Sequence, residues 1–381
     1  MGWIYLALPA ALIWLAILLL PWGPARVREV LDAHADAPPD TELSDVTVLI
    51  PARNEAASIA TTLQALNGQG HGLKIVLVDD ESTDATIEVA RRTARHELRV
   101  ITGRPLPTGW AGKLWALEQG RAQLDRPLTL LLDADIKLGA GMLVALRNKL
   151  QRDGYQFVSV MAALRMRNFW EKLLLPAFVF FFRLLYPFRL SNNPRHPHVA
   201  AAAGGCVLLE TRLITDIGGF EALRGALIDD CTLARRVKAV GAKTWIGLTH
   251  SARSVRAYEG FSAIWDMVAR SAFTQLHYSA AALFACTLIL IVAYWLPVAG
   301  LLFPSVWAQY IAALALAAMI TSYLPTLRFY GLAGTWALAM PVIGTLYLAV
   351  TWSSALRYWR GQRSHWKGRI YTKTLDSRQK S

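Results

Sequence analysis

The sequence predicts an α/β domain with a mainly parallel β-sheet, flanked by membrane-spanning helices on both sides. Through the middle of the chain, short β-branched runs alternate with longer helical stretches, a pattern typical of βαβ units. Long uncharged apolar segments lie before and after this region. Of the 381 residues, 54% are hydrophobic and only 18% are charged. This composition excludes a disordered chain and argues against an ordinary soluble protein.

The first 25 residues predict a membrane-spanning helix. They carry no charged side chain, and the apolar run from Trp3 to Trp22 is 20 residues long. A spanning helix needs about 20 residues, and tryptophan is common at both membrane surfaces. A cleaved signal peptide is the alternative, but its basic leader is missing. Arg26 and Arg28 then place the following region in the cytoplasm by the positive-inside rule.

Residues 279–356 predict about three further membrane segments, near 280–303, 306–327 and 332–356. Three crossings after a cytoplasmic domain would put the C-terminal tail outside, against the positive-inside rule. Because Pro341 and Gly344 interrupt the last segment, a re-entrant or interfacial segment stays open as an alternative.

The basic tail at residues 357–381 explains over half of the net charge of +13, since it has eight basic residues against Asp376 alone. Basic residues beside an apolar block are attracted to anionic lipid, so we interpret the tail as a juxtamembrane anchor. No nucleic-acid-binding motif accompanies the charge, and we expect no nucleic-acid partner.

The central domain is predicted at residues 44–250, with buried strands at 46–50, 75–78, 128–132 and 157–161. Ligands of such sheets bind beyond the carboxyl ends of the strands. An amphipathic interface helix is expected at residues 251–278, because apolar residues including Ile264 and Val268 share one helical face.

Acidic side chains follow three of the predicted strands. Glu55 comes after the first, Asp79 and Asp80 end the second, and Asp133 and Asp135 follow the third. Each cluster alone could cap a turn or a helix. Together, however, carboxylates at neighbouring strand ends repel one another and need a cation or polar ligand. The Asp-x-Asp spacing suits Mg²⁺ or Mn²⁺ bridging a diphosphate.

Two other phosphate-binding motifs are missing. Gly109 and Gly112 have the wrong spacing for a P-loop, and no GxGxxG follows a strand, so a P-loop ATPase and a nicotinamide enzyme are not expected. Lys113 offers a single positive charge for a phosphate, with an ordinary solvated lysine as the alternative.

Seven motifs in order closely resemble the family 2 glycosyltransferases, inverting enzymes of GT-A fold, across residues 46–250. They are Val48-Leu-Ile-Pro-Ala-Arg-Asn-Glu55, Val78-Asp-Asp-Glu-Ser-Thr-Asp-Ala-Thr86, Gly112-Lys-Leu-Trp-Ala-Leu117, Leu132-Asp-Ala-Asp135, Gly204-Gly-Cys-Val-Leu-Leu-Glu-Thr-Arg212, Ile217-Gly-Gly-Phe220 and Ile228-Asp-Asp-Cys-Thr-Leu-Ala-Arg-Arg236. The flanking helices and residues 256–276 resemble the hopene-associated branch, found with hopanoid biosynthesis.

The resemblance implies a role for each matching residue. Asp230 would be the general base on the acceptor hydroxyl, and Asp133 and Asp135 would bind the metal. The implied substrate-binding residues are Pro51, Glu55, Asp79, Asp80, Lys113, Asp133, Gly205 and Asp229. An N-terminal cap of the following helix is the alternative role for Asp229 and Asp230.

The resemblance therefore implies an inverting glycosyltransferase that moves one sugar from a nucleotide donor, expected to be a UDP-sugar, to a lipid acceptor. The QxxRW motif of processive members is missing at Gln275, so we expect a single transfer. We expect a multi-pass protein of the bacterial inner membrane with its catalytic domain in the cytoplasm. A sugar nucleotidyltransferase and a non-catalytic membrane scaffold or transporter are the alternatives.

Overall fold

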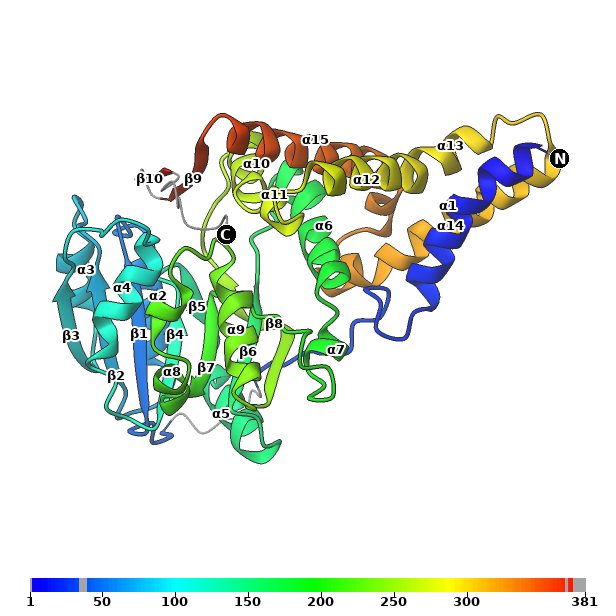
Figure 1. Ribbon diagram of the computed structural model, residues 1–381. Coiled ribbons are helices and arrows are strands. Elements are labelled where there is room, and N and C mark those ends of the chain that lie inside the picture. The colour runs from blue at the N-terminus through cyan, green and yellow to red at the C-terminus, as the bar shows by residue number, and fades with distance from the viewer. Residues whose placement is uncertain (1, 34–39, 367–368, 373–381) are drawn as a thin grey trace. The chain divides into compact units, whose positions relative to one another are not determined.

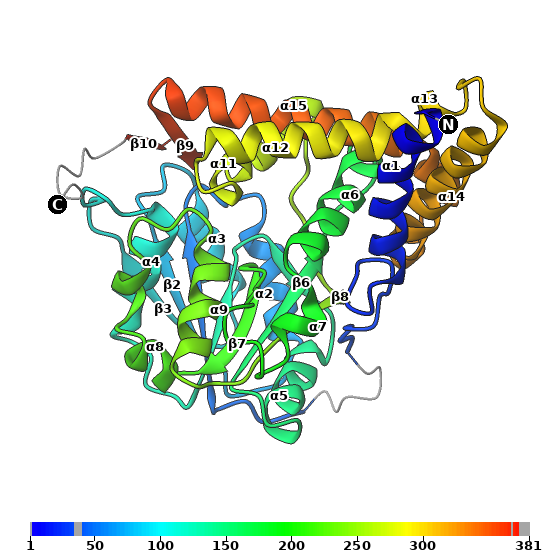
Figure 2. The same cartoon turned by 45° about the vertical axis from the view of Figure 1, so that its right-hand side comes forward.

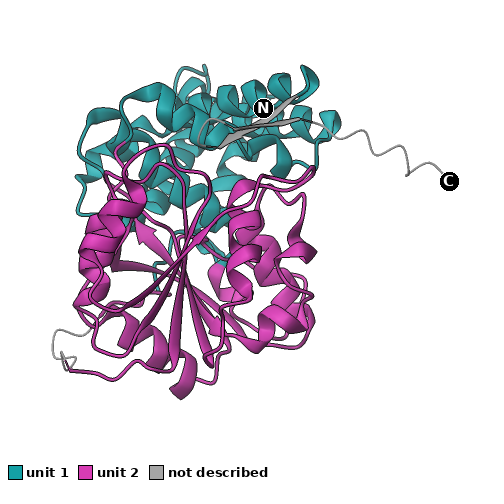
Figure 3. Cartoon of the chain, turned by 90° about the vertical axis from the view of Figure 1, so that its left-hand side faces the viewer, with its two compact units in different colours: residues 1–28, 166–187, 258–363 teal, residues 29–165, 188–257, 364–381 magenta. Residues whose placement is uncertain are grey.

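The computed structural model describes residues 2–33, 40–366 and 369–372. The chain divides into two compact units, each assembled from segments that are distant in the sequence (Figure 3). The helical unit comprises residues 1–28, 166–187 and 258–363, and the sheet unit comprises residues 29–165, 188–257 and 364–381.

The sheet unit is built on an eight-stranded sheet with the order β3-β2-β1-β4-β7-β6-β8-β5 (Figure 1). Its strands are β1 (Val46–Ala52), β2 (Lys74–Asp79), β3 (Glu97–Thr102), β4 (Leu128–Leu132), β5 (Ile136–Leu138), β6 (Phe157–Ala163), β7 (Cys206–Glu210) and β8 (Thr244–Ser254).

The sheet confirms the predicted α/β class, and the four predicted strands correspond to β1, β2, β4 and β6. Parallel pairing joins β1 to β2 and β4, β2 to β3, and β6 to β8. Strand β7 is antiparallel to β4 and β6, and β5 is antiparallel to β8. The sheet is thus mixed, with the parallel pairings concentrated in the half that contains β1 to β4.

Helices cover both faces of the sheet (Figure 2). Alternate residues of each strand point to opposite sides, and the apolar side chains on both sides are buried under helices. Val48 and Ile50 pack with α2, α3 and α5 on one face, whereas Leu49 packs with α4, α8 and α9 on the other. The helices of this unit are α2 (Ile59–Asn67), α3 (Thr86–Thr93), α4 (Gly112–Arg121), α5 (Met142–Arg152), α7 (Phe188–Ser191), α8 (Arg212–Asp216), the 3₁₀ helix η1 (Phe220–Leu223) and α9 (Asp229–Ala239).

The register of the parallel strands brings the acidic clusters to one edge of the sheet. Ala52 at the end of β1 pairs with Asp79 at the end of β2, and Leu49 of β1 pairs with Leu131 of β4. Since parallel neighbours end at the same edge, the loops that follow β1, β2 and β4 leave the sheet side by side.

Within the part of the chain that the structure describes, the helical unit contains four helices that are long and apolar enough to cross a membrane: Gly2–Leu19, Ala280–Gly300, Val306–Phe329 and Gly334–Trp359. Its elements are α1 (Gly2–Leu19), α6 (Phe169–Leu185), α10 (Phe261–Ala269), α11 (Ala272–Gln275), α12 (Ala280–Leu290), the π-helical turn η2 (Ile291–Trp295), α13 (Leu296–Gly300), α14 (Val306–Phe329), the 3₁₀ helix η3 (Gly334–Ala339) and α15 (Met340–Trp359). Helices α1 and α14 pack through Ala10, Ala11 and Ala315, as small residues allow in membranes.

The last apolar segment changes from 3₁₀ to α-helix at Met340. Pro341 lies in the first turn of α15, where the missing N–H breaks no helical hydrogen bond. At Gly344, an added Cβ would lie 2.6 Å from the ring of Tyr294, so this glycine permits close helix packing. Both residues thus fit within a continuous helical segment.

The predicted interface region and the basic tail contain several short helices and strands. In the predicted interface region, residues 251–254 belong to β8, and α10 and α11 follow, with Ile264 and Val268 buried. In the basic tail, β9 (Gln362–Trp366) pairs with β10 (Arg369–Thr372). The remaining tail residues, 367–368 and 373–381, lie outside the described residues.

Helix α4 packs tightly on the sheet at Gly120, where an added Cβ would lie 2.4 Å from Leu49 Cδ1 and 2.9 Å from Val78 Cγ2. Because all of these atoms are in the packed core, we expect Gly120→Ala to destabilise the protein by about 1–3 kcal/mol. The measurement is the thermal unfolding midpoint of the full chain in detergent. Gly68→Ala is the control, since the contact nearest its added Cβ is an ordinary 3.7 Å. Equal midpoints for both variants would contradict the prediction.

Candidate active site

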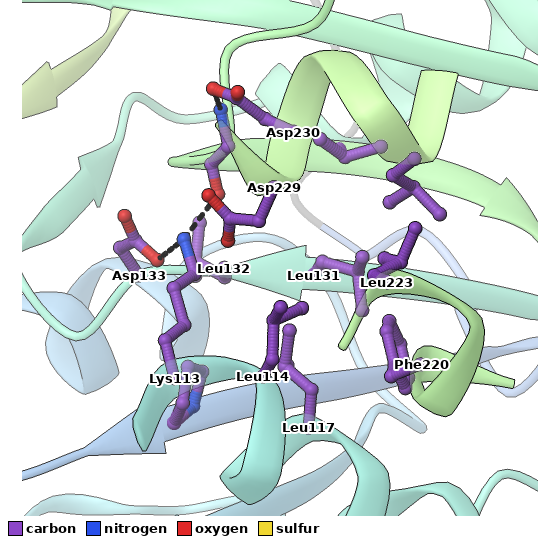
Figure 4. A pocket seen from close by; sticks show the side chains of 14 residues that line it. Lys113, Leu114, Leu117, Leu131, Leu132, Asp133, Phe220, Leu223, Asp229 and Asp230 are labelled. Carbon is purple, nitrogen blue, oxygen red and sulfur yellow. Dashed lines mark hydrogen bonds and ion pairs between the residues drawn. The ribbon is translucent and has the colours of Figure 1, made fainter. Parts of the chain in front are cut away.

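A pocket in the sheet unit collects five of the predicted site residues (Figure 4). Its polar side chains are Lys113 at the start of α4, Asp133 after β4, and Asp229 and Asp230 at the start of α9. The rest of the lining is mostly apolar and comprises Pro51, Leu114, Leu117, Leu131, Leu132, Gly204, Val207, Phe220, Leu223 and Leu233. Four charged groups thus converge on a cavity whose lining is otherwise mostly apolar.

Lys113 is the cation at the centre of this group. Its Nζ lies 2.6 Å from Asp133 Oδ1 and donates a hydrogen bond of 3.1 Å to the carbonyl of Gly204. Burial alone would lower the pKa of Lys113, but Asp133, Asp229 and Asp230 outweigh it and raise the pKa above its ordinary value. Lys113 is therefore a paired ammonium, and the alternative of a solvated surface lysine is wrong.

Asp230 is held by backbone N–H groups. Its Oδ2 accepts a hydrogen bond of 3.0 Å from Gly204 N, and its Oδ1 accepts one of 2.7 Å from Cys231 N. Asp229 and Asp230 both lie in the first turn of α9, where the helix dipole favours carboxylates. The N-cap residue itself is Ile228. Gly204 thus contacts Lys113 through its carbonyl and Asp230 through its N–H.

Burial raises the pKa of the Asp230 carboxyl to about 6, with Asp229 contributing in the same direction. The N–H groups of Cys231 and Gly204 and the charge of Lys113 oppose this rise. A carboxylate with a pKa just below neutral is mostly ionised at neutral pH yet accepts a proton readily. These are the properties of a general base.

A second cluster joins Glu55, Asp135 and Arg256. The Nε of Arg256 lies 3.2 Å from Asp135 Oδ2, and a terminal guanidinium nitrogen lies 3.5 Å from Glu55 Oε1. Asp135 also accepts a hydrogen bond of 3.3 Å from Ser254 Oγ. Burial and then the charge of Asp133 raise the pKa of the Asp135 carboxyl, while Arg256 lowers it.

Hydrogen bonds connect the loops that follow β1 and β2. Arg53 donates to the carbonyl of Asp80, and Asn54 N donates a hydrogen bond of 3.0 Å to Ser82 Oγ. Gly103 donates to the Asp79 carbonyl at 2.7 Å, and an added Cβ there would lie 2.6 Å from the same oxygen. The backbone of Asp79 is therefore fixed by a neighbouring glycine.

The predicted site residues fall into three neighbouring groups. Pro51, Lys113, Asp133, Asp229 and Asp230 line the pocket; Glu55 and Asp135 share Arg256; Asp79 and Asp80 end β2. Gly205 contacts Asp133 through the backbone, since the N–H of Asp133 donates a hydrogen bond of 3.0 Å to the carbonyl of Gly205. Among the described residues, no group of three or more His, Cys, Asp or Glu side chains could hold a metal ion.

Asp133 and Asp135 nevertheless fit a divalent cation that also binds a substrate. Mg²⁺ is commonly held by one or two carboxylates together with substrate phosphates. The charge of Asp133 raises the pKa of Asp135, so the two carboxylates are close enough to repel each other. A bound cation would relieve this repulsion.

Two contributors were not among the predicted site residues, Gly204 and Arg256. Gly204 acts through its backbone, which no side-chain pattern reveals. The ion pairs of Arg256 depend on β8, a strand that the apolar pattern did not predict, since only its first six residues are consistently buried. The signal for Arg256 was its basic charge at the start of the matching segment 256–276, where an arginine can assist a phosphate or lie at the membrane interface.

A profile described as "Glycosyltransferase like family 2" matches residues 44–274. The chain belongs to this family. The match spans more than half of the chain and includes both side-chain clusters of the sheet unit.

Two curated relatives match shorter stretches. A 4,4'-diaponeurosporenoate glycosyltransferase of Staphylococcus haemolyticus is 31% identical over 93 residues, 24% of each chain. A beta-monoglucosyldiacylglycerol synthase of Nostoc sp. is 31% identical over 137 residues, which cover 33% of this chain and 28% of the relative. The chain thus aligns with less than a third of the length of either relative.

A solved structure of similar fold is the mannosyltransferase PcManGT from Pyrobaculum calidifontis, in complex with GDP-Man and Mn²⁺. The two chains are 20% identical, the TM-score is 0.51, and the alignment covers 93% of this chain and 99% of that one. This likeness confirms the predicted GT-A fold.

The raised pKa of Asp230 predicts a pH-dependent cost in stability. Its ordinary pKa of 3.8 rises to about 6 on folding, which corresponds to roughly 3 kcal/mol at most. Because the unfolded carboxyl loses its proton first, the folded protein loses stability as the pH rises between these two values. We expect Asp230→Asn, which cannot ionise, to gain stability relative to the native protein over that window. The measurement is the difference between their unfolding midpoints in detergent at several pH values.

Asp84→Asn is the control of opposite sign. Burial would raise the pKa of Asp84, but hydrogen bonds from Thr86 and Ala56 lower it below its ordinary value. The charged form of Asp84 therefore stabilises the folded protein at neutral pH. Relative to the native protein, Asp84→Asn should become less stable as the pH rises. A pH-independent difference for Asp230→Asn would rule out the raised pKa.

Proposed function

We propose that the protein is a membrane-bound, metal-dependent, inverting glycosyltransferase that moves a single sugar from a nucleotide donor to a lipid acceptor. The observation that carries this proposal is that Gly204 contacts two groups of different chemistry, Lys113 through its carbonyl and Asp230 through its N–H. Asp230 has the pKa of a base on one side, and the Lys113–Asp133 ion pair offers charges for a diphosphate on the other.

The donor half of the site would lie over the carboxyl ends of β1, β2 and β4. Pro51, Glu55, Asp79 and Asp80 would hold the base and ribose, since carboxylate oxygens accept hydrogen bonds from ring N–H and hydroxyl groups. Gly205 and Asp229 complete the proposed binding surface, and Lys113 would place its ammonium against a phosphate. A UDP-sugar is the proposed donor.

The diphosphate would be held beside Asp133 and Asp135. These two residues would bind Mg²⁺ or Mn²⁺, which supplies Lewis-acid stabilisation of the charge that develops on the leaving nucleoside diphosphate. PcManGT, which has the same fold, was solved with GDP-Man and Mn²⁺.

Asp230 would remove the proton of the acceptor hydroxyl as the oxygen attacks the anomeric carbon. A base on the face opposite the leaving group gives direct displacement, and therefore inversion. Since the Asp230 pKa is about 6, transfer by the free enzyme should fall as the pH drops through that value.

A lipid acceptor is supported by two observations. Apolar helices long enough to cross a membrane lie in the sequence both before and after the family's domain. The Nostoc relative is named for a glycosylated diacylglycerol. We place the protein in the bacterial inner membrane as a multi-pass protein with a cytoplasmic catalytic domain, and a hopanoid-related lipid is the proposed acceptor class.

Two variants separate the proposed roles of the aspartates. Asp135→Ala should lower donor turnover by roughly a hundredfold or more, because it removes a proposed cation ligand. Asp230→Asn should abolish transfer while leaving nucleotide binding intact, because its role begins after donor binding. The measurements are release of free nucleoside diphosphate from a labelled donor and nucleotide binding by calorimetry. Release of pyrophosphate instead would favour a sugar nucleotidyltransferase, and no release at all would favour a scaffold or transporter.

A comparison of lipids would identify the acceptor. We expect a glycolipid of defined mass in the parent strain and its loss in a deletion strain, with restoration by the native gene. A gene for Asp230→Asn is the matched control, since it should express a folded protein and restore nothing. Identical lipid profiles in the parent and deletion strains would contradict the lipid acceptor.

A further inference from the structure

Arg256 covers two carboxylates that are largely hidden from solvent. The Arg256 side chain is 41% exposed, whereas those of Glu55 and Asp135 are 13% and 12% exposed. Its guanidinium reaches both, at 3.5 Å from Glu55 and 3.2 Å from Asp135. A cationic group therefore already neutralises one of the two aspartates proposed to bind the metal.

We propose that Arg256 is a built-in counterion that competes with the divalent cation for Asp135 and so makes cation binding depend on the nucleotide. This inference rests on the metal-dependent function proposed above. It assigns Arg256 the task of a positioning residue that controls when the cation binds.

Both proposed metal ligands are engaged by cations of the chain itself. Asp133 pairs with Lys113 at 2.6 Å, and Asp135 pairs with Arg256. A divalent ion that approached alone would have to displace these groups or sit beside them, and like charges at such distances repel. Two carboxylates also supply few of the oxygens that Mg²⁺ or Mn²⁺ requires.

A nucleoside diphosphate changes this balance. Its phosphates add negative charge and oxygen ligands for the cation. They also offer the guanidinium a new partner, because arginine binds phosphate through two parallel hydrogen bonds. Arg256 can therefore leave Asp135 without remaining as an unpaired charge.

The local structure allows Arg256 to move while Asp135 stays in place. Ser254 Oγ donates to the Asp135 carboxylate at 3.3 Å, and Val255 N donates to the Asp135 carbonyl at 2.9 Å. Both contacts are independent of the guanidinium. The half-exposed Arg256 side chain lies two residues beyond the end of β8, so its reorientation requires no change in the packed core.

The experiment measures Mn²⁺ binding to the full chain in detergent by electron paramagnetic resonance, with and without UDP or GDP. In the native protein, the nucleotide should strengthen Mn²⁺ binding by roughly a hundredfold. Arg256→Ala should strengthen binding of Mn²⁺ alone by roughly tenfold and reduce the effect of the nucleotide. Arg256→Lys, which keeps the charge, should lie closer to the native protein.

Two further variants test the mechanism of this effect. Arg253→Ala removes a guanidinium from β8, three residues before Arg256, and should leave Mn²⁺ binding unchanged, since Arg253 Nε donates to the His250 carbonyl at 2.9 Å. Adding Asp135→Asn to Arg256→Ala should cancel the gain, because the competition concerns Asp135. An equal gain in Arg253→Ala, or a gain that survives Asp135→Asn, would mean a general charge effect and overturn the proposal.

The outcomes also separate this inference from the proposed function. Tight Mn²⁺ binding to the native protein without nucleotide would overturn the role of Arg256 and leave metal-dependent transfer intact. The native titration gives this result even if Arg256→Ala does not fold. Absence of Mn²⁺ binding even with both nucleotides would overturn the metal-dependent function as well.

Discussion

Repulsion among neighbouring carboxylates is the constraint that organises the site. Asp133, Asp229 and Asp230 all act on the charge of Lys113, and Asp133 also acts on Asp135. Two unit charges separated by about 4 Å interact by roughly 4 kcal/mol near a protein surface, so this arrangement is costly without counterions. Lys113 and Arg256 supply them, and backbone N–H groups stabilise Asp230. The positions of these cations follow from the need to keep the acids together.

The parallel register of the sheet creates this concentration of charge. Because β1 lies between β2 and β4, three consecutive acidic loops emerge at one edge. The antiparallel strand β7 then brings Gly204 and Gly205 to the same edge, since Cys206 at its start pairs with Leu132 at the end of β4. Strand order thus explains why residues that are distant in the sequence meet at Lys113.

Much of this arrangement was predictable because it depends on buried apolar runs. Strands β1, β2 and β4 are buried at every position, which produces the continuous hydrophobic pattern expected of a parallel sheet. Strand β3 was missed because most of its residues are partly or fully exposed, and the short β5 because it has three residues. The acids from Glu55 to Asp135 were found because they end or closely follow predictable strands, whereas Asp229 and Asp230 were found through the resemblance of their motif.

The contacts between these acids and their cations were less predictable, because they depend on pairing between distant segments. Arg256 reaches Asp135 only because β8 is antiparallel to β5, with Ser254 opposite Ile136. Nothing in the local sequence specifies that register. The same holds for Gly204, whose backbone contacts to Lys113 and Asp230 require that α4, α9 and the start of β7 converge.

Asp133 and Asp230 are the same residue type in one pocket, yet their surroundings suit them to different chemistry. Asp133 forms a direct ion pair with Lys113, at 2.6 Å between Oδ1 and Nζ. Asp230 is desolvated by burial and lies beside Asp229, and both raise the pKa of its carboxyl. Gly204 lies against both Lys113 and Asp230, since an added Cβ would lie 3.1 Å from Asp230 Cβ and 3.3 Å from Lys113 Nζ. The glycine therefore allows the two side chains to lie near each other, and the charge of Lys113 moderates the raised pKa of Asp230.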